Sequence, residues 1–159
     1  MQVTQQQLDK MLPPPPKPAA NYVPVREAAG MLHVAGQTPH VAGEIALRGV
    51  VGDSVSAEEA RELARTAALN AVAALQQHLG NLSRLSHFVS MTVFIAAVPP
   101  FTRHPWVADG ASSVLIELFG DAGRHARAAV GVASLPDGAP VEVSVIAYAH
   151  PSSASGAGL

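Results

Sequence analysis

Two apolar runs near the C-terminus, residues 127–132 and 141–149, constrain the fold of this chain more than any other feature. Both are rich in valine and alanine, and valine favours strands, while the Leu-Pro-Asp-Gly sequence between them favours a turn. The pattern predicts an antiparallel hairpin. Arg127 opens the first run and Glu142 lies inside the second. Burying an unpaired charge is costly, so we expect each of them to have a partner.

The alternation of valines sets the expected register of this hairpin. If Val132 lies opposite Val141, the valines of both runs share one face. Arg127 and Glu142 then share the other face, but Glu142 lies opposite Gly131, about 13 Å from Arg127. We therefore expect each charge to find its partner on another strand, a ligand or a neighbouring subunit. The alternative is an edge hairpin that carries two solvated charges.

Local signals predict the remaining elements. Ser56 and Glu59 form a capping-box pattern at the start of a helix with an apolar stripe, and Gly80 is placed to end that helix. A second helix is expected at residues 106–119, and strands are expected at residues 31–35, 44–50 and 85–97. The order β-β-α-β-α-β-β predicts an α+β fold with two helices on one face of a sheet.

The two ends of the chain differ from its middle. Residues 1–20 contain Pro13–Pro16 and Pro18, a composition typical of an extended, polyproline-like arm. Such an arm is either a loose leader or a segment that packs on a neighbour. Residues 151–159 are predicted to be a disordered tail. The remaining residues, 21–150, are predicted to form one domain.

Composition narrows the classes of function. Hydrophobic residues make up 48% of the chain and charged residues 14%, which favours an oligomer that hides apolar surface. The net charge of −2 and the 4% aromatic content disfavour binding to nucleic acid. The chain has no cysteine, no apolar run long enough to span a membrane and no signal-peptide pattern. A cytoplasmic protein is expected.

Sequence motifs for the commonest catalytic sites are also missing. The seven histidines show no metal-binding spacing, so no metal site is expected, and His33, His78 and His87 are interpreted as structural or surface residues. No nucleophile elbow, phosphate-binding loop or dinucleotide fingerprint occurs, and the sequence positions no serine with a histidine and an aspartate.

The C-terminal pattern resembles that of the RidA family of reactive-intermediate deaminases, also called YjgF or endoribonuclease L-PSP proteins. The matching residues are Arg127, Val130-Gly131-Val132, Leu135-Pro136, Val141-Glu142-Val143 and, earlier, Ala35-Gly36-Gln37. Tyr22 lies 14 residues before Gly36, at the spacing of the family's pocket tyrosine. The resemblance covers residues 20–149, and the longer middle indicates a divergent subgroup.

The resemblance implies a chorismate-mutase-like fold and a homotrimer with pockets at the subunit interfaces. It implies that Arg127 binds the carboxylate of an imine or enamine such as 2-aminoacrylate, and that Glu142 positions the water that releases ammonia and a 2-keto acid. Tyr22, Gly36 and Ser112 would line the pocket, and no cofactor or metal would be needed. The chain departs from the family at Ala35, Ser112 and Ser144, where a serine, an asparagine and a second glutamate are common.

Four hypotheses about function remain. The leading one is a trimeric imine or enamine deaminase that acts on small carboxylate-bearing metabolites. Ala35 and Ser144 motivate the second, a non-catalytic carboxylate binder or sensor on the same fold. RNA cleavage is disfavoured by the charge and aromatic content. The fourth is a pathway-specific hydrolase for one larger imine.

Overall fold

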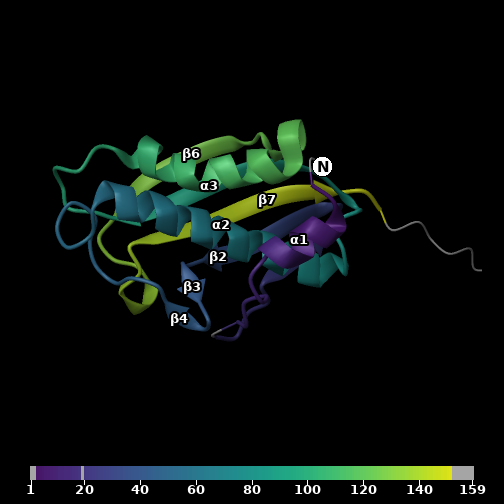
Figure 1. The fold of residues 1–159 in the computed structure, drawn as a ribbon, viewed down its shortest axis with the longest axis horizontal. Helices are drawn as coiled ribbons and strands as arrows, with labels where there is room; N and C mark the ends of the chain where they lie inside the picture. Colours follow the sequence, from purple (N-terminus) through teal and green to yellow (C-terminus); the bar gives the residue numbers. More distant parts are fainter. Residues whose placement is uncertain (1–2, 19, 152–159) are drawn as a thin grey trace, which may run out of the picture.

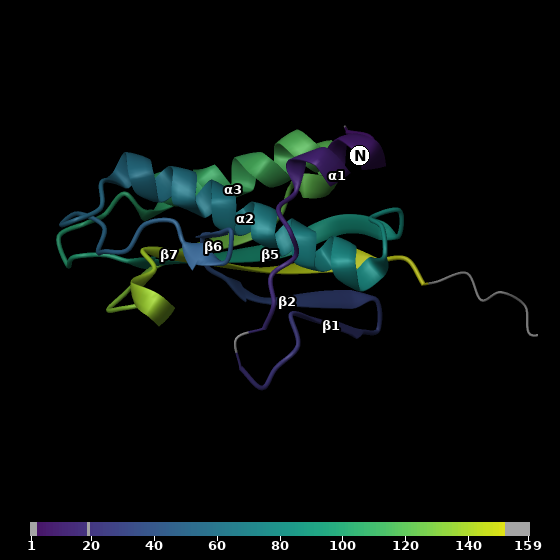
Figure 2. The same ribbon diagram turned by 60° about the horizontal axis from the view of Figure 1, so that its bottom comes forward.

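A computed structural model describes residues 3–18 and 20–151, and all of the predicted tail except Pro151 lies outside them. Its main feature is a five-stranded sheet with the strand order β1-β2-β7-β5-β6, and two long helices cover one face of this sheet (Figures 1 and 2). The strands are β1 (Val25–Ala28), β2 (Met31–Gln37), β5 (Leu85–Ala96), β6 (Ala126–Val132) and β7 (Val141–Ala149), and the long helices are α2 (Ala57–Leu79) and α3 (His104–Phe119). This is the predicted α+β architecture.

Helix α2 begins and ends where the sequence predicts. The Ser56 side chain accepts a hydrogen bond from the Glu59 amide at 3.1 Å, and the Glu59 carboxylate accepts one from the Ser56 amide at 2.8 Å. Gly80 follows the helix with a φ of 78°, a conformation that favours glycine. The alanine-rich stripe of the helix is buried against the sheet and α3, where small side chains allow close packing.

The predicted C-terminal hairpin is wrong. Strands β6 and β7 do not pair with each other, because β5 lies between them, parallel to β6 and antiparallel to β7. Helix α3 connects β5 to β6, and a crossover helix of this kind joins parallel neighbours. The segment between β6 and β7, which contains the short helix η2 (Pro136–Gly138), crosses the end of β5, where the amide of Ala96 donates to the carbonyl of Pro140 at 2.9 Å.

The predicted strand at residues 44–50 is also wrong. Only β4 (Glu44–Ile45) forms there, and it pairs with β3 (His40–Val41) in a separate two-stranded ribbon. Strand β2 has β1 on one side and β7 on the other, so both of its edges are occupied. The predicted order β-β-α-β-α-β-β therefore holds for the main sheet, but β1 and β2 are its first two strands.

The N-terminal segment is not extended throughout. Residues Gln5–Met11 form helix α1, which begins with a capping box at Thr4, whereas the proline-rich residues 13–18 have no regular secondary structure. Gln5 and Asp9 of α1 bond to Gln76 of α2 at 3.2 and 2.8 Å. Leu8 is fully buried in the core. The arm therefore packs on its own chain through α1.

In the part of the chain that the structure describes, no helix is both long enough and apolar enough to cross a membrane.

Burial of Leu8 makes α1 part of the folded domain. We expect Leu8→Ala to lower the free energy of unfolding by about 2–5 kcal/mol, the usual cost of truncating a buried leucine. The matched control is Met11→Ala in the same helix, because Met11 is 48% exposed and its truncation should change stability little. Urea denaturation followed by circular dichroism measures both. Equal stability of the two variants would show that α1 does not dock.

Candidate functional site

The side chain of Arg127, on strand β6, points to the helix-covered face of the sheet. Arg127 lies beside Met91 of β5 in the register, and Met91 is buried beneath the helices. Paired residues on neighbouring strands point to the same side of a sheet. Because β6 is the outermost strand, Arg127 also lies at the rim of the sheet, and its side chain is 22% exposed.

Helix α3 holds the Arg127 guanidinium in place. Nη1 donates to Asp109 Oδ1 at 2.8 Å and to Ser112 Oγ at 3.0 Å, and Nη2 donates to the carbonyl of Pro105 at 3.2 Å. Asp109 and Ser112 are three residues apart and share one side of the helix. The partner of Arg127 is thus a helix of the same chain, which was not among the expected partners.

One edge of the guanidinium remains available. Within residues 3–18 and 20–151, no acceptor bonds Nε–H, and Nη2 has one acceptor for its two hydrogens. Nε and Nη2 lie side by side on one edge of the guanidinium, the edge that binds a carboxylate through two parallel hydrogen bonds. The three bonds to α3 fix the orientation of this edge in advance.

Ser112 and His125 extend the group around Arg127. Ser112 Oγ lies 3.1 Å from His125 Nε2, and His125 Nδ1 lies 2.7 Å from the carbonyl oxygen of Gly123 in the short helix η1 (Gly120–Gly123). Burial lowers the pKa of His125. The bond to Gly123 opposes this effect, and the nearby charge of Arg127, the smallest of the three causes, lowers the pKa further. We call Arg127, Asp109, Ser112 and His125 the Arg127 cluster.

Glu142 lies on the other face of the sheet. Its neighbours Val141 and Val143 are fully buried under the helices, so the side chain of Glu142 points to the face without helices, here called the open face. Gly36 lies directly against its carboxyl group, where a Cβ on residue 36 would collide with Glu142 Oε1. Strand β2 contains a bulge between Val34 and Gln37, which includes Gly36. Glu142 and Gly36 form the Glu142 cluster.

The environment of Glu142 favours its protonated form. Burial raises the pKa of its carboxyl group. In the described part of the chain it has neither a salt bridge nor a hydrogen bond to offset that burial. A half-buried carboxyl group with a raised pKa holds its proton to higher pH than an exposed glutamate and is suited to general acid–base chemistry.

Tyr22 lies near the Gly36 end of β2. The carbonyl of Pro24 accepts a hydrogen bond from the Ala35 amide at 2.9 Å, so the segment before β1 continues beside β2 towards Gly36. The Tyr22 side chain is 49% exposed. Tyr22 and Gly36 thus belong to the same end of the sheet, whereas Ser112 belongs to the Arg127 cluster.

The structure separates Arg127 from Glu142. Arg127 pairs with Met91 of β5, and Glu142 pairs with Phe94 of the same strand. An offset of three residues places the two side chains on opposite faces, about 10 Å apart along the strand and two strand spacings across the sheet. The prediction that they share a face is wrong, and no direct ion pair joins them among the described residues.

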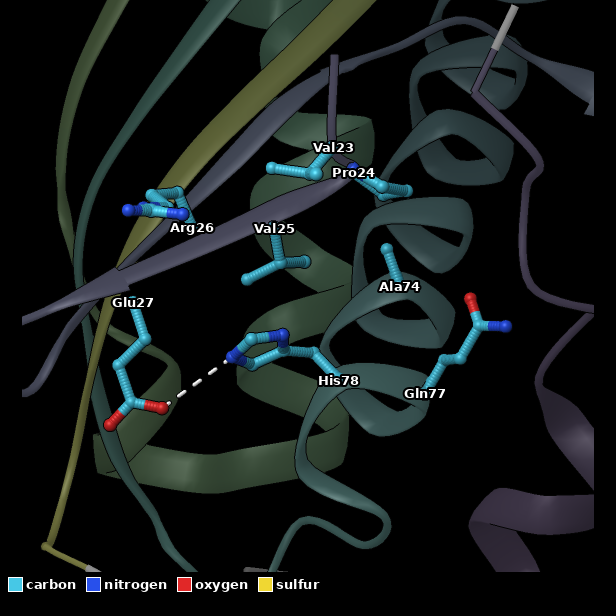
Figure 3. Close-up of a pocket in the computed structure, with 8 residues that line it drawn as sticks. All are labelled: Val23, Pro24, Val25, Arg26, Glu27, Ala74, Gln77 and His78. Carbon is cyan, nitrogen blue, oxygen red and sulfur yellow. Dashed lines mark ion pairs between the residues drawn. The ribbon is translucent and has the colours of Figure 1, made fainter.

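A groove lies elsewhere on the described part of the chain. It has a volume of about 520 Å³ and runs between β1 and the C-terminal half of α2, where His78 Nε2 lies 3.5 Å from Glu27 Oε2 (Figure 3). Its lining residues are Val23, Pro24, Val25, Arg26, Glu27, Ala74, Gln77 and His78. None of the site residues predicted from the sequence lines it. The described residues also contain no group of three histidine, aspartate or glutamate side chains able to hold a metal.

Sequence reasoning missed two members of the Arg127 cluster, Asp109 and His125. Two spacings carried the signal: Asp109 precedes Ser112 by three residues on a helix, and His125 precedes Arg127 by two residues in the segment that leads into β6. Each spacing places its pair on one face, but only the fold shows that these faces meet. The structure also positions His125 beside Ser112, but the other ring nitrogen of His125 bonds to the Gly123 carbonyl and not to an aspartate.

Comparisons with known proteins agree with this fold. Residues 10–148 match the family described as YjgF/chorismate mutase-like, putative endoribonuclease. The curated Protein TCP17 of Trypanosoma cruzi is 42% identical over 142 residues, 89% of each chain.

Solved structures show the same fold. Atu1372 of Agrobacterium tumefaciens, a protein of unknown function, is 37% identical with a TM-score of 0.85 over 92% of each chain. A putative endoribonuclease from Shewanella oneidensis MR-1 is 29% identical with a TM-score of 0.86 over 92% of this chain and 99% of its own. E. coli TdcF, solved with bound serine, shares the fold at 23% identity and a TM-score of 0.59, over 87% of this chain and 94% of its own. The chain therefore belongs to the YjgF/chorismate mutase-like family, which includes the RidA and L-PSP proteins.

Proposed function

We propose that this protein is a homotrimeric deaminase that hydrolyses small 2-imino acids, of the kind formed from 2-aminoacrylate, to 2-keto acids and ammonia. One observation carries the proposal. Arg127 presents a pre-oriented edge with two hydrogen-bond donors, and Glu142 presents a half-buried carboxyl group with a raised pKa, but one chain holds them on opposite faces of its sheet. Two subunits are needed to complete one site.

Arg127 binds the substrate carboxylate in this proposal. The Nε–Nη2 edge accepts both carboxylate oxygens, while Asp109 and Pro105 keep the guanidinium from rotating. Serine, the molecule bound in TdcF, carries a carboxylate of this kind. Fixing the carboxylate also fixes the imine carbon next to it, which supplies orientation to the reaction.

Glu142 of a neighbouring subunit acts as the general base and then the general acid in this proposal. Its carboxylate accepts a proton from water as the water oxygen bonds to the imine carbon, and the C=N double bond becomes a single bond. The carboxyl group then returns the proton to the nitrogen, which leaves a carbon that carries a hydroxyl and an amino group. Glu142 next takes the proton of that hydroxyl group and passes it to the nitrogen, so the C–N bond breaks, ammonia leaves and the C=O bond of the 2-keto acid forms. Imines hydrolyse readily in water, so this mechanism requires no metal or cofactor.

The open face provides the surface for assembly. Helices α1, α2 and α3 all lie on the other side of the sheet (Figure 2). Val130, 40% exposed, and the half-buried Phe94 and Ile146 contribute apolar surface to the open face. A sheet face of this kind is stabilised by packing against another layer. Contact between this face and the β6 rim of a neighbour would bring Glu142 to Arg127.

Ser144 favours a second candidate function, a carboxylate binder without turnover. Its hydroxyl donates to the carbonyl of Val34 at 3.1 Å, so it takes a structural role where many family members carry a second glutamate. Glu142 is then the one carboxyl group of its cluster. Binding of 2-keto acids without hydrolysis of 2-imino acids would identify this alternative.

Removing the guanidinium tests the carboxylate-binding role. We expect Arg127→Ala to lower kcat/KM for a freshly generated 2-imino acid by on the order of 100-fold, because two charge-assisted hydrogen bonds are lost. The assay couples 2-keto acid formation to a dehydrogenase. The control is Arg103→Ala, an arginine whose side chain is 52% exposed. Unchanged turnover by Arg127→Ala would contradict the proposal.

Replacing Glu142 separates turnover from binding. We expect Glu142→Gln to lose turnover while still binding a 2-keto acid in calorimetry. Stability should also change with pH: burial raises the pKa of Glu142 in the folded state, so the folded protein loses stability as pH rises from the ordinary value of 4.5 through that raised pKa.

Glu142→Gln removes this loss because its amide stays neutral. It should therefore unfold at higher urea concentration than the parent at pH 7.5 and at a similar concentration at pH 4. The control is Glu44→Gln, which replaces an exposed carboxylate on β4. A Glu142→Gln protein with full turnover would contradict the proposed role.

A charge on the open face tests the assembly. We expect the parent protein to have the mass of a trimer in light scattering, and Val130→Asp to dissociate it while circular dichroism shows a folded chain. The matched control is Val41→Asp on β3, because Val41 is 56% exposed and lies outside the main sheet. A monomeric parent, or a trimeric Val130→Asp, would rule out packing through this face.

A further inference from the structure

Asp109 lies between two arginines that come from different elements. Its Oδ1 accepts a hydrogen bond from Nη1 of Arg127 at 2.8 Å, and its Oδ2 lies 3.9 Å from Nη1 of Arg61 on α2. Each oxygen of one carboxylate therefore faces a different guanidinium group. Arg61 has no part in the mechanism described above, although it is the second cation beside the partner of Arg127.

Other contacts than Asp109 hold Arg61 in place. Its Nη1 donates a hydrogen bond to the carbonyl of Trp106 at 2.8 Å, and its guanidinium carbon lies 4.7 Å from the centre of the Trp106 ring. Helices α2 and α3 cross closely at this point, because a Cβ on Gly110 would collide with the carbonyl oxygen of Arg61. Stacking on an aromatic ring and a hydrogen bond together orient a guanidinium group. Arg61 thus stays near Asp109 without depending on it.

The charges of these three residues alternate in space. Asp109 alone would balance the charge of Arg127, and a carboxylate bound on the Nε–Nη2 edge would then add a second negative charge to a neutral pair. Arg61 supplies the second positive charge. With it, the order is Arg61, Asp109, Arg127 and the bound anion, so every negative charge has a positive charge beside it.

A bound carboxylate and Asp109 would approach the same guanidinium from opposite sides. Nη1 of Arg127, which bonds to Asp109, lies across the guanidinium from the Nε–Nη2 edge. The two carboxylates would not touch, but they would repel each other. The side chain of Arg127 is 22% exposed, so water screens this repulsion only in part. A positive charge next to Asp109 opposes the repulsion.

We infer that Arg61 is a positioning residue for the proposed carboxylate site, and that its charge lets Asp109 orient Arg127 without cancelling the attraction of Arg127 for an anion. The inference rests on the proposed function, because it assumes that a substrate or product carboxylate binds to Arg127. It adds to that site a residue of α2 that acts through Asp109 and does not touch the substrate.

The same pair of helices provides a matched control. Arg65 lies one turn after Arg61 on α2 and forms an ion pair with Glu117 of α3 at 2.7 Å. The side chains of Arg61 and Arg65 are 30% and 35% exposed. Both arginines therefore bridge the two helices with similar exposure. Among the described residues, only the acid beside Arg61 bonds to Arg127.

Calorimetry on the full-length protein at pH 7.5 and low ionic strength tests the inference. The probe is 2-oxobutanoate, a stable 2-keto acid with an ionised carboxylate. We expect Arg61→Gln to bind it about threefold more weakly than the parent, within the range measured for partly exposed charge pairs. Arg61→Lys keeps the charge and should bind like the parent, and so should Arg65→Gln. Arg61→Met, whose stem can still cover Trp106, gives a second neutral variant.

Salt separates the charge of Arg61 from its packing. The screening length falls from about 30 Å at 0.01 M ionic strength to about 3 Å at 1 M. The difference between the parent and Arg61→Gln should therefore disappear as sodium chloride is raised, whereas a difference caused by disturbed packing would remain. In kinetics, Arg61→Gln should raise KM for a 2-imino acid by the same factor and leave kcat unchanged, because Arg61 is remote from the reacting atoms.

Each of three results would overturn the inference. The first is equal binding by the parent and both neutral Arg61 variants. The second is an Arg61→Lys protein as weak as Arg61→Gln, which would assign the effect to the contacts with Trp106. The third is a loss of affinity that persists at high salt. All three leave the proposed function intact, whereas a parent protein that binds no 2-oxobutanoate at any salt concentration contradicts the proposed function itself.

Discussion

The position of β5 between β6 and β7 determines where Arg127 and Glu142 lie on the sheet. Arg127 and Glu142 are held against Met91 and Phe94 of the same strand, and three residues is an odd offset. Because side chains alternate along a strand, an odd offset sends the two charges to opposite faces. A direct hairpin of β6 and β7 would have placed them on one face. The inserted strand thus divides the polar groups into two incomplete clusters.

The two clusters are complementary. Around Arg127, helix α3 supplies acceptors for three N–H groups and leaves an edge of two donors without acceptors in the described part of the chain. Around Glu142, the sheet and Gly36 remove water without supplying a donor, which raises the pKa of the carboxyl group. Among the described residues, the Arg127 cluster has hydrogen-bond donors without acceptors, and the Glu142 cluster has an acceptor without a donor. A small anion and a water molecule between them would satisfy both.

Local signals in the sequence predicted the helices and strands well, but they predicted poorly which strands lie next to each other in the sheet. The Ser56 capping box, Gly80 and the β-branched run of β5 act within a few residues, so helix α2 and β5 were predictable. The turn signal at Leu135-Pro136 indicates that the chain reverses direction, but it cannot show that β5 lies between β6 and β7. The resemblance predicted that Arg127 and Ser112 belong to one site, and in the structure the two side chains are hydrogen-bonded. His125 was overlooked because its partner, Ser112, lies on a helix that only the crossover brings to β6.

Burial shifts the pKa values of Glu142 and His125 in opposite directions. It raises the pKa of Glu142 and lowers that of His125, so the neutral form of each residue is favoured. Asp109 bonds to one side of the Arg127 guanidinium at 2.8 Å. Under the proposed function, the attraction for a substrate carboxylate therefore resides in Arg127, the charged member of this set. Glu142 and His125 lie on opposite sides of the sheet, and burial makes both easier to hold in the neutral form, so neither competes with a substrate carboxylate for the guanidinium as a full charge would.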